Sequence, residues 1–375
     1  MNKPKILFIM HMPPPIHGAA MMGQYIHDSR LINERFECYY INPSLSDSVA
    51  NVGKFSISKI VSAIKNIFFI IKEVKKIRPN LCYYTPTADG WGIYRDLFVL
   101  AALKWNKQKI VLHMHNKGVA KYSVKHIGAR FAYKYIFKGA KVILLASELY
   151  QDIRDYVQPE NVYYCPNGIP ITNYETFCRR TTNKKYTFLF LSNMIEEKGV
   201  IDVLKACAIL KGENRSFKCQ FVGKWSTVSE EYFNEIIEKY NIKDVVGYLG
   251  PKYGKEKVDA LKKADALVFP TFYHGETFGL VLLEAMEYAL PCISTYEGGI
   301  PSVIDNENTG LLIRTRDVEA LAAKMRWLIE YPLEGLIMGE KGRKKFLNEF
   351  TLDIFEKRLS EILFKESNGD GMPIS

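Results

Sequence analysis

Two glutamates set eight residues apart, Glu276 and Glu284, are the strongest candidates for chemistry in this chain. An apolar run ends at Pro270 and a helical pattern begins near Gly279, which predicts a loop position for Glu276 and a helix position for Glu284. Carboxylates placed in this way can hold hydroxyls on two parts of one ligand, while N–H groups of the first helical turn meet phosphate oxygens. The residues leave an alternative open, in which Glu276 only caps the helix and Glu284 is a solvated helix residue. Glu284 stands among apolar neighbours, however, where an unpaired carboxylate would be costly.

Basic side chains follow two other predicted strands. Lys198 stands where a helical pattern begins, and a mobile ammonium there can follow the charge on a departing phosphate. The alternative is an ordinary exposed lysine at a helix start. His113 and His115 end a strand, and alternation places both on one side, which also resembles a two-histidine metal arrangement. No cysteine or carboxylate lies near them in the sequence, so we expect no metal site.

Short apolar runs alternate with longer amphipathic segments along most of the chain, which predicts βαβ units and parallel sheets. Strands are expected over 5–10, 37–41, 81–85, 109–113, 141–146, 162–165, 187–192, 218–222, 246–249, 266–269, 291–295 and 310–313. Helices are expected over 56–77, 126–138, 198–211, 228–240, 254–263, 279–289, 317–331 and 352–366. Ligands of such sheets bind at the carboxyl ends of the strands, where the candidate residues stand.

The length of 375 residues exceeds the size at which one hydrophobic core stops growing. We therefore predict an α/β protein of two Rossmann-like domains, whose parallel sheets face each other across a cleft. The N-terminal domain is expected over 1–180, joined by a C-terminal helix over 350–367, and the C-terminal domain over 181–349. The boundary is expected within 168–186, where Gly168, Pro170 and a run of polar residues break the periodicity.

Four short motifs follow one another in the central and C-terminal parts of the chain. They are Pro166-Asn167-Gly168, Glu197-Lys198-Gly199, the stretch from Phe269 to Met286 with its two glutamates, and Gly298-Gly299-Ile300-Pro301 followed by Asn308-Thr309-Gly310. In order and spacing they resemble the retaining glycosyltransferases of family 4, the glycogen-synthase-like group with the GT-B fold. The resemblance covers residues 140–315 well and the rest loosely.

The resemblance implies a role for each matching residue. It places Glu284 on the ribose hydroxyls of a nucleotide, Glu276 on hydroxyls of the donor sugar and Lys198 on the donor phosphates. It also implies that His115 points toward the sugar and that Gly18, in the loop after the first strand, approaches the diphosphate. The remaining donor-binding positions that it implies are Asn193, Thr277, Phe278, Gly279 and Leu280. No Asp-x-Asp occurs in the sequence, so we expect neither a metal nor a cofactor.

Three positions depart from the family pattern. Asn193 stands where the family usually has an arginine, five residues before the lysine, so one charge partner of the phosphates is missing. The usual Glu-Gly-Phe-Gly reads Glu276-Thr277-Phe278-Gly279, and Ser302 replaces an acid that often follows Gly-Gly-x-Pro. None of these changes removes the two glutamates.

Positive charge is concentrated in the first half of the chain. Residues 1–185 carry a net charge of +15 and the remainder −5, and residues 97–147 contain ten Lys and Arg without one Asp or Glu. We expect Arg130, Lys134, Lys138 and Lys141 on one helix face, interleaved with aromatic residues. A solvated helix face is the simpler interpretation, but the absence of acids favours peripheral contact with an anionic membrane surface. Nucleic acid is the rival partner, and no recognised nucleic-acid-binding module is present, so we expect none to bind.

Composition sets the remaining limits. Seven cysteines without a close pair argue against a disulfide framework and a zinc site, and favour a reducing compartment. No apolar run approaches the ~18 residues that span a bilayer. We expect a cytoplasmic protein that can lie peripherally at the inner face of the plasma membrane.

The sequence therefore predicts a metal-independent hexosyltransferase of the retaining type. It would move a sugar from a nucleotide-sugar donor to a saccharide or lipid-linked saccharide acceptor, in cell-surface polysaccharide biosynthesis. The alternative from another class is a catalytically silent, glycosyltransferase-like protein that only binds the nucleotide sugar. A nucleotide-sugar epimerase is a third interpretation, but the chain lacks the Gly-x-Gly-x-x-Gly fingerprint of a nicotinamide site.

Overall fold

The computed structural model describes residues 3–14, 17–43, 57–172 and 185–368. For residues 57–66 it describes the backbone alone. The chain divides into two compact units, which are described one at a time. The N-terminal unit comprises Met1–Asn167 with Leu352–Ser375, and the C-terminal unit comprises Gly168–Thr351.

The N-terminal unit is built on a six-stranded sheet with the order β2-β1-β3-β4-β5-β6, and every neighbouring pair is parallel. Parallel strands are buried on both faces, which is why β1 and β4 consist almost entirely of apolar residues. The strands are β1 (Lys5–Ile9), β2 (Glu37–Ile41), β3 (Leu81–Tyr84), β4 (Ile110–His113), β5 (Lys141–Leu144) and β6 (Val162–Tyr164).

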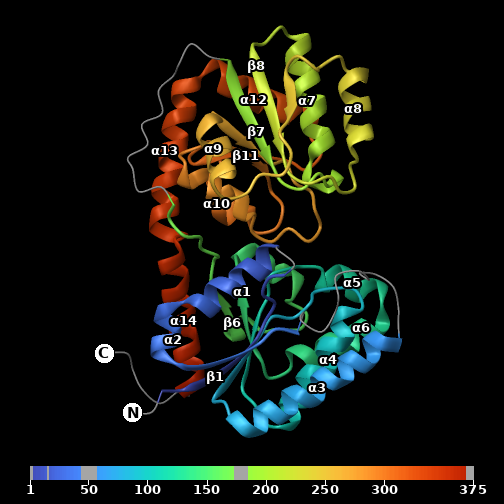
Figure 1. Ribbon diagram of the computed structural model, residues 1–375, viewed down its shortest axis with the longest axis vertical. Helices are drawn as coiled ribbons and strands as arrows, with labels where there is room; N and C mark the ends of the chain where they lie inside the picture. Colours follow the sequence, from blue (N-terminus) through green and yellow to red (C-terminus); the bar gives the residue numbers. More distant parts are fainter. Residues whose placement is uncertain (1–2, 15–16, 44–56, 173–184, 369–375) are drawn as a thin grey trace. The chain divides into compact units, whose positions relative to one another are not determined.

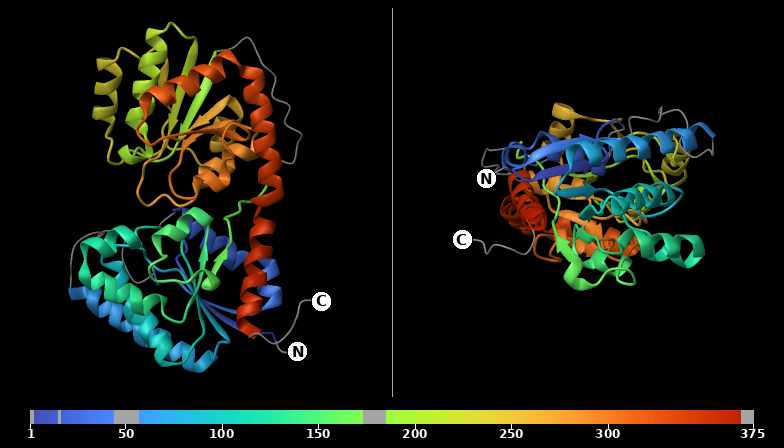
Figure 2. Two further views of the ribbon diagram at one scale, coloured as in Figure 1. Left: turned by 180° about the vertical axis from the view of Figure 1, so that it is seen from behind. Right: turned by 90° about the horizontal axis from the view of Figure 1, so that it is seen from below.

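Helices cover both faces of this sheet (Figures 1 and 2). On one face α4 packs between α3 and α6, and on the other α2 packs against α14, the helix that ends the described chain. The helices are α1 (Gly18–Asp28), α2 (Arg30–Arg35), α3 (Ile57–Ile77), α4 (Gly92–Trp105), α5 (Val119–Lys125), α6 (Ile127–Phe137) and α14 (Leu352–Asn368).

The C-terminal unit repeats the design with a second parallel sheet of order β12-β11-β10-β7-β8-β9. Its core joins the apolar faces of β7, β8 and α7 with those of α8 and α12. The strands are β7 (Tyr186–Leu191), β8 (Phe217–Val222), β9 (Val246–Tyr248), β10 (Ala266–Val268), β11 (Cys292–Thr295) and β12 (Gly310–Ile313). The helices are α7 (Val200–Gly212), α8 (Glu230–Lys239), α9 (Gly254–Lys263), α10 (Leu280–Glu287), α11 (Ile300–Val303), α12 (Val318–Glu330) and α13 (Pro332–Glu349).

The predicted α/β class with two Rossmann-like parallel sheets is confirmed, and each of the twelve predicted strands lies within two residues of an observed one. The predicted helices do not include α1, α2, α4, α5, α11 and α13. Helix α13 shows one physical reason. This helix buries Gly335, Gly339 and Gly342, and a Cβ added to Gly339 would lie 2.0 Å from the carbonyl oxygen of Ala289. Glycines that allow close packing against α10 do not produce a helical repeat of apolar residues, so the hydrophobic pattern did not predict this helix.

The expected four-residue basic face on one helix is wrong at its C-terminal end. Helix α6 ends at Phe137, and Gly139 adopts a positive φ of 69°, so the chain turns before the last two positions of the predicted row. Lys138 is the C-cap residue, and Lys141 begins β5, where its amine donates to the side-chain oxygen of Asn161 at 3.0 Å. Only Arg130 and Lys134 remain on the exposed side of the helix.

Strand order reverses once in each sheet, and this decides where the candidate residues gather. In the C-terminal unit the reversal lies between β7 and β10, and in the N-terminal unit it lies between β1 and β3. Loops that leave the carboxyl ends of two such strands diverge to opposite faces of the sheet, which leaves a crevice for ligands. Lys198 follows β7, Glu276 follows β10, and Gly18 follows β1.

Candidate functional site

Lys198 and Glu276 meet at the strand-order reversal of the C-terminal unit. The ammonium of Lys198 lies 2.6 Å from Glu276 Oε2, and the two side chains are only 15% and 10% exposed. The ring centroid of Tyr273 lies 4.4 Å from the same Nζ. The carboxylate and the aromatic ring both stabilise the positive charge of Lys198.

Backbone contacts fix the two loops that carry this pair. The N–H of Phe272 donates to the carbonyl of Glu197 at 2.8 Å, so the loop after β10 is bonded to the residue that precedes Lys198. Gly199 has a φ of +89°, and a Cβ there would lie 2.6 Å from the carbonyl oxygen of Pro270. Glycine at this position therefore allows both the left-handed turn and the close approach of the two loops.

The other oxygen of Glu276 accepts a hydrogen bond from the N–H of Gly279 at 3.1 Å, at the N-cap of α10. The capping role considered for this glutamate is thus real, and it coexists with the bond to Lys198. Because both carboxylate oxygens are engaged, the side chain is fixed at the positive end of the α10 dipole. The N–H of Gly279 and the ammonium of Lys198 therefore bind the same carboxylate.

The residues between Glu276 and α10 contribute mainly backbone. Phe278 is buried and packs edge-on against Phe350, with ring centroids 5.8 Å apart, so its side chain serves the core. Thr277 is buried, and its carbonyl accepts from the N–H of Gly299 at 2.9 Å. Leu280 is the first residue of α10 and is partly exposed.

The glycine pair after β11 completes the same loop cluster. Gly298 has a φ of +57°, and a Cβ there would lie 2.3 Å from the carbonyl oxygen of Glu276. No side chain larger than hydrogen fits at that distance. The motif therefore positions the loop of Glu276 by close backbone contact.

Glu284 does not share the lysine of Glu276. It lies in α10, 25% exposed, and its Oε1 accepts from the amine of Lys257 in α9 at 2.9 Å. The apolar neighbours of Glu284 in the sequence are buried, but its own side chain reaches a polar partner at the surface. A hydroxyl-bearing ligand at Glu284 would compete with, or bridge to, this ammonium.

Asn193 lies in the loop after β7, with its side chain exposed. Its carbonyl accepts from the N–H of Ile195 at 2.7 Å, which shapes the turn toward Lys198. In this loop Asn193 therefore supplies a neutral amide and no positive charge.

In the N-terminal unit, histidines from two strand ends lie together. The rings of His113 and His115 are 4.1 Å apart, and His113 Nδ1 lies 2.6 Å from the hydroxyl of Tyr83. Burial lowers the pKa of His115 to about 3, with smaller contributions from His11 and His17 after the first strand. Burial also lowers the pKa of His11 to about 4. These imidazoles are neutral at physiological pH and can donate or accept hydrogen bonds without carrying charge.

The segment after β1 leads into α1 beside this cluster, and Gly18 lies in the helix and not in the predicted loop. Gly18 is the first residue of the helix, and His17 caps it by accepting the N–H of Ala20 on Nδ1 at 3.2 Å. Arg95 and Asp96 belong to the same end of the sheet and act electrostatically on His11. Asp96 is fully buried and accepts from the hydroxyl of Tyr84 at 2.7 Å and the N–H of Thr87 at 2.6 Å, so its role is to hold the loop after β3.

Sequence reasoning missed three contributors: Lys257, Tyr273 and His11. Lys257 stands 27 residues before Glu284 on another helix, so no spacing pattern joins them. Tyr273 lay within the recognised motif without an assigned role. His11 could have been found, because it directly follows the first predicted strand, and ligands of such sheets bind at the carboxyl ends of strands.

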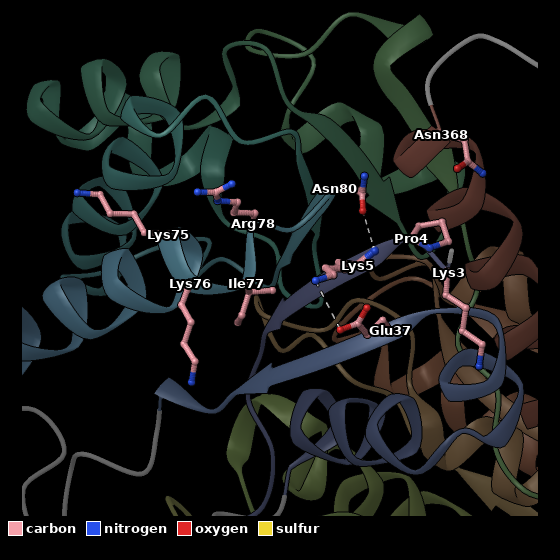
Figure 3. A pocket seen from close by; sticks show the side chains of 10 residues that line it. All are labelled: Lys3, Pro4, Lys5, Glu37, Lys75, Lys76, Ile77, Arg78, Asn80 and Asn368. Carbon is pink, nitrogen blue, oxygen red and sulfur yellow. Dashed lines mark hydrogen bonds and ion pairs between the residues drawn. The ribbon is translucent and has the colours of Figure 1, made fainter. Parts of the chain in front are cut away.

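A cavity of about 880 Å³ lies elsewhere in the N-terminal unit, at the amino-terminal ends of β1 and β2 and the start of β3 (Figure 3). We call it the basic cavity. Lys5 forms part of its wall, with its amine 3.7 Å from Glu37 and its N–H bonded to Asn80 at 2.8 Å. Gly18 and His115 follow the carboxyl ends of β1 and β4, whereas the basic cavity lies at the amino-terminal ends of the strands. The basic cavity is therefore not part of the candidate site. It is lined by Lys3, Pro4, Lys5, Glu37, Lys75, Lys76, Ile77, Arg78, Asn80 and Asn368.

Two further properties concern the whole described chain. Among the described residues, no group of three or more His, Cys, Asp or Glu side chains is arranged to hold a metal ion. Across residues 3–14, 17–43, 57–172 and 185–368, no helix combines the length and the apolar character that a bilayer crossing requires.

Comparison with known proteins places this chain among glycosyltransferases. Residues 175–345 match the family model described as "Glycosyl transferases group 1". The chain is 25% identical over 242 residues to the putative colanic acid biosynthesis glycosyltransferase WcaL of Salmonella typhimurium, a match that covers 62% of this chain and spans 58% of WcaL. It is 30% identical over 348 residues to the N-acetyl-alpha-D-glucosaminyl L-malate synthase of Bacillus anthracis, covering 79% of this chain and 88% of that protein.

The fold is also shared with solved structures. A crystal structure of HepE from Anabaena in complex with UDP superimposes with a TM-score of 0.72 at 15% sequence identity. That comparison covers 96% of this chain and 99% of HepE. The two parallel sheets and their connecting helices therefore recur over nearly the full length of both proteins.

Proposed function

Because this chain belongs to the glycosyl transferases group 1 family, we propose that it is a retaining glycosyltransferase. It moves a sugar from a nucleoside-diphosphate sugar to a saccharide or lipid-linked saccharide acceptor. Relatives named for colanic acid and capsular polysaccharide biosynthesis support a place in cell-surface polysaccharide assembly. A cytoplasmic location, where nucleotide sugars are made, belongs to the same proposal.

One observation carries the proposal: the contact of 2.6 Å between Lys198 and Glu276 at the start of α10. A Lys ammonium has three N–H groups, so the bond to Glu276 leaves it able to bind phosphate oxygens as well. The positive end of the helix dipole stabilises negative charge at the same point. A diphosphate bound here brings the sugar attached to it within reach of Glu276.

In the proposed reaction the bond between the sugar C1 and the diphosphate oxygen breaks, and a bond from C1 to the acceptor oxygen forms on the same face. The departing phosphate oxygen takes the proton of the acceptor hydroxyl, so charge and atoms balance. Lys198 and the N–H groups of α10 stabilise the diphosphate as its charge grows. Glu276 orients the sugar hydroxyls and Glu284 holds the ribose, so the protein mainly positions the reactants.

The remaining site residues have roles in the same proposal. Gly279 and Leu280 present backbone N–H groups at the helix start, and Thr277 and Phe278 hold the loop in place. Gly18 and His115 belong to this proposal through the family resemblance, which assigns Gly18 to the diphosphate and the imidazole of His115 to the sugar. The structure of HepE with UDP supports a uridine nucleotide as the first donor to test.

A screen of UDP-, GDP-, ADP- and CMP-sugars by thermal shift tests donor binding. A ligand at 100 times its Kd stabilises the folded protein by about 2.7 kcal/mol, which a melting curve resolves. Turnover is then followed by release of the nucleoside diphosphate, and the anomeric configuration of the product by NMR. Absence of stabilisation by every nucleotide sugar would remove the proposal, and an inverted product would remove its retaining part.

Asn193 motivates a second candidate, a protein that binds the nucleotide sugar without turning it over. The exposed amide stands where the family usually has an arginine, so one positive charge near the leaving group is missing. Stabilisation by a donor, together with no hydrolysis and no transfer to any saccharide, would favour this candidate. An Asn193→Arg substitution that restored turnover would identify the missing charge as the cause.

A lipid-linked acceptor would place the enzyme at a membrane. Exposed basic residues of the N-terminal unit, among them Arg130, Lys134 and Lys138, support peripheral binding to an anionic membrane surface. Lys141 adds to the positive charge of the same unit from the start of β5. Co-sedimentation with anionic and neutral vesicles tests this part, and equal binding to both would contradict it.

A further inference from the structure

Helices α4 and α6 of the N-terminal unit present large apolar side chains to solvent. Phe98 and Trp105 of α4 are 61% and 88% exposed, and Ile127 and Phe131 of α6 are 73% and 68% exposed. Trp91, the N-cap of α4, is 77% exposed. Single exposed apolar residues are ordinary on a protein surface, but several on neighbouring helices are not.

The spacing of these residues places them in rows. Trp91, Phe98 and Trp105 are seven residues apart, which is two helical turns, so they project from one side of α4. Ile127 and Phe131 are four residues apart and form a second row on α6. The α4 row extends over about four turns and the α6 row over about one. The buried residues of both helices lie on other sides.

The two rows lie side by side. Near the starts of the helices, a Cβ added to Gly128 of α6 would lie 3.3 Å from the hydroxyl of Tyr94 in α4. Near their ends, the amine of Lys104 in α4 donates to the carbonyls of Ile136 at 3.0 Å and Lys138 at 2.8 Å. The helices therefore run alongside each other in the same direction, and Figure 1 shows them as neighbours. We call the exposed side chains of Trp91, Phe98, Trp105, Ile127 and Phe131 the α4–α6 apolar surface.

Positive charge lies beside the α4–α6 apolar surface. Lys121, Lys125, Arg130 and Lys134 are exposed on α5 and α6. From 57 to 147 the sequence contains 17 Lys and Arg against three Asp and Glu, and one of those acids is the buried Asp96. Exposed aromatic rings among basic side chains match the interface of an anionic bilayer, where the rings enter the headgroup region and the lysines reach the phosphates.

We propose that the α4–α6 apolar surface inserts into the headgroup–acyl boundary of an anionic membrane and holds the enzyme there. The binding is hydrophobic as well as electrostatic, with Phe98, Trp105 and Phe131 as the inserting side chains. In this arrangement the protein lies on the membrane surface and is held there by these side chains. The proposal rests on the proposed function only in explaining why a transferase would bind there, since the membrane would hold a lipid-linked acceptor.

Flotation with vesicles of phosphatidylglycerol and phosphatidylcholine tests the proposal. The double substitution Phe98→Ser with Phe131→Ser should lower the partition coefficient by about tenfold or more, because two rings no longer leave water. The matched control is Leu333→Ser with Ile337→Ser on α13, whose side chains are 61% and 54% exposed in the other unit, and it should bind as the wild type does. All four positions are exposed, so both variants should fold and melt like the wild type.

Two further measurements separate the hydrophobic part from the electrostatic part. Replacing Lys125, Arg130 and Lys134 by Gln should weaken binding about fivefold per charge, and salt should mimic that loss without abolishing binding. Brominated lipids should quench the fluorescence of Trp105, which a Trp105→Phe variant identifies. Unchanged binding of the Phe98→Ser and Phe131→Ser variant, or no quenching at saturation, would overturn the proposal.

If this surface binds another partner, the same experiments should give different results. Loss of binding on Lys75→Gln with Lys76→Gln, but not on the phenylalanine substitutions, would assign lipid binding to the basic cavity. Tight binding of a single-stranded oligonucleotide through the same rings, with no vesicle binding, would assign the surface to nucleic acid. A dimer that the phenylalanine substitutions convert to monomer would assign it to a second copy of the chain. Each of these outcomes contradicts the proposal.

Failure of this proposal and failure of the proposed function are distinguishable. Donor binding is measured by thermal shift without lipid, and turnover is measured with a soluble saccharide acceptor. The surface variants should retain both, since none of their residues lies among the site residues. Loss of vesicle binding with intact turnover confirms the membrane surface alone, whereas absent turnover with intact vesicle binding contradicts only the catalytic proposal.

Discussion

The pair formed by Lys198 and Glu276 should be energetically coupled more strongly than a second Lys–Glu pair in the same unit. Lys198 and Glu276 are 2.6 Å apart and 15% and 10% exposed, whereas Lys257 and Glu284 are 2.9 Å apart and 32% and 25% exposed. Both pairs join the same chemical groups, so burial is the main difference between them. The chain thus contains its own control.

The expected magnitudes follow from burial. A hydrogen bond between charged groups that are largely removed from water contributes about 1.5–3 kcal/mol, so Lys198→Met should lower the free energy of unfolding of the C-terminal unit by that amount. Glu276 keeps its bond from the N–H of Gly279, which prevents a larger loss. Lys257→Met should cost about 0.5–1 kcal/mol, because water replaces much of the interaction of a partly exposed pair.

Double-mutant cycles measure the two couplings directly. Lys198→Met and Glu276→Gln are made singly and together, and the same is done with Lys257→Met and Glu284→Gln. Urea unfolding is followed by fluorescence in a background carrying Trp91→Phe and Trp105→Phe. The remaining tryptophans, Trp225 and Trp327, both belong to the C-terminal unit.

Catalysis provides the second readout of the same pair. Loss of a cation that stabilises a departing diphosphate should lower kcat/KM by about 10²–10³-fold in Lys198→Met, with partial recovery in Lys198→Arg. Equal coupling in the two pairs would refute the argument from burial. A Lys198→Met enzyme with wild-type kcat/KM would refute the placement of the phosphates at this lysine.

Three further predictions concern other parts of the site. Glu284→Gln should weaken nucleotide binding by about tenfold by calorimetry, because a charged acceptor for the ribose hydroxyls is lost, whereas Lys257→Met should not weaken it, since it frees the carboxylate. The NMR signal of His115 should not titrate between pH 8 and 5, because its folded pKa is about 3. In the unfolded chain a histidine has a pKa near 6.5, so the unfolded state binds the proton at a higher pH than the folded state does. The free energy of unfolding should therefore fall as the pH drops below about 6.5, by up to about 1.4 kcal/mol per pH unit. His115→Gln should reduce that slope. A signal that shifts with a midpoint near pH 6.5 would contradict the buried neutral imidazole. Gly298→Ala should lower the free energy of unfolding by more than the ~1–2 kcal/mol of a left-handed alanine, because its Cβ would lie 2.3 Å from the carbonyl oxygen of Glu276. The same substitution should reduce turnover. The control Gly250→Ala, with a φ of +74° and no atom within 4 Å, should show only the conformational loss in the same denaturation assay.

The sequence alone was sufficient for the fold class and the family. Buried parallel strands are nearly continuous apolar runs bounded by turn residues, so β1, β4 and β7 could be located from local pattern. The family resemblance came from four motifs whose order does not depend on packing, and it is confirmed by the match over residues 175–345 and by a relative 30% identical over 348 residues. Local signals failed where packing replaced periodicity, as in α13 with its buried glycines.

Only the tertiary structure decided which candidate residues touch. Strand order in the C-terminal sheet brings the loops after β7 and β10 together, so Lys198 meets Glu276 across 78 residues of sequence. The same folding assigns Lys257 to Glu284, a pairing that no spacing rule contains. It also turns the chain after Phe137 and leaves the apolar rows of α4 and α6 in solvent, because helix ends and side-chain exposure depend on contacts between distant segments. Local sequence thus determines the elements and their chemistry, whereas partners, burial and surfaces come from the order in which the strands assemble.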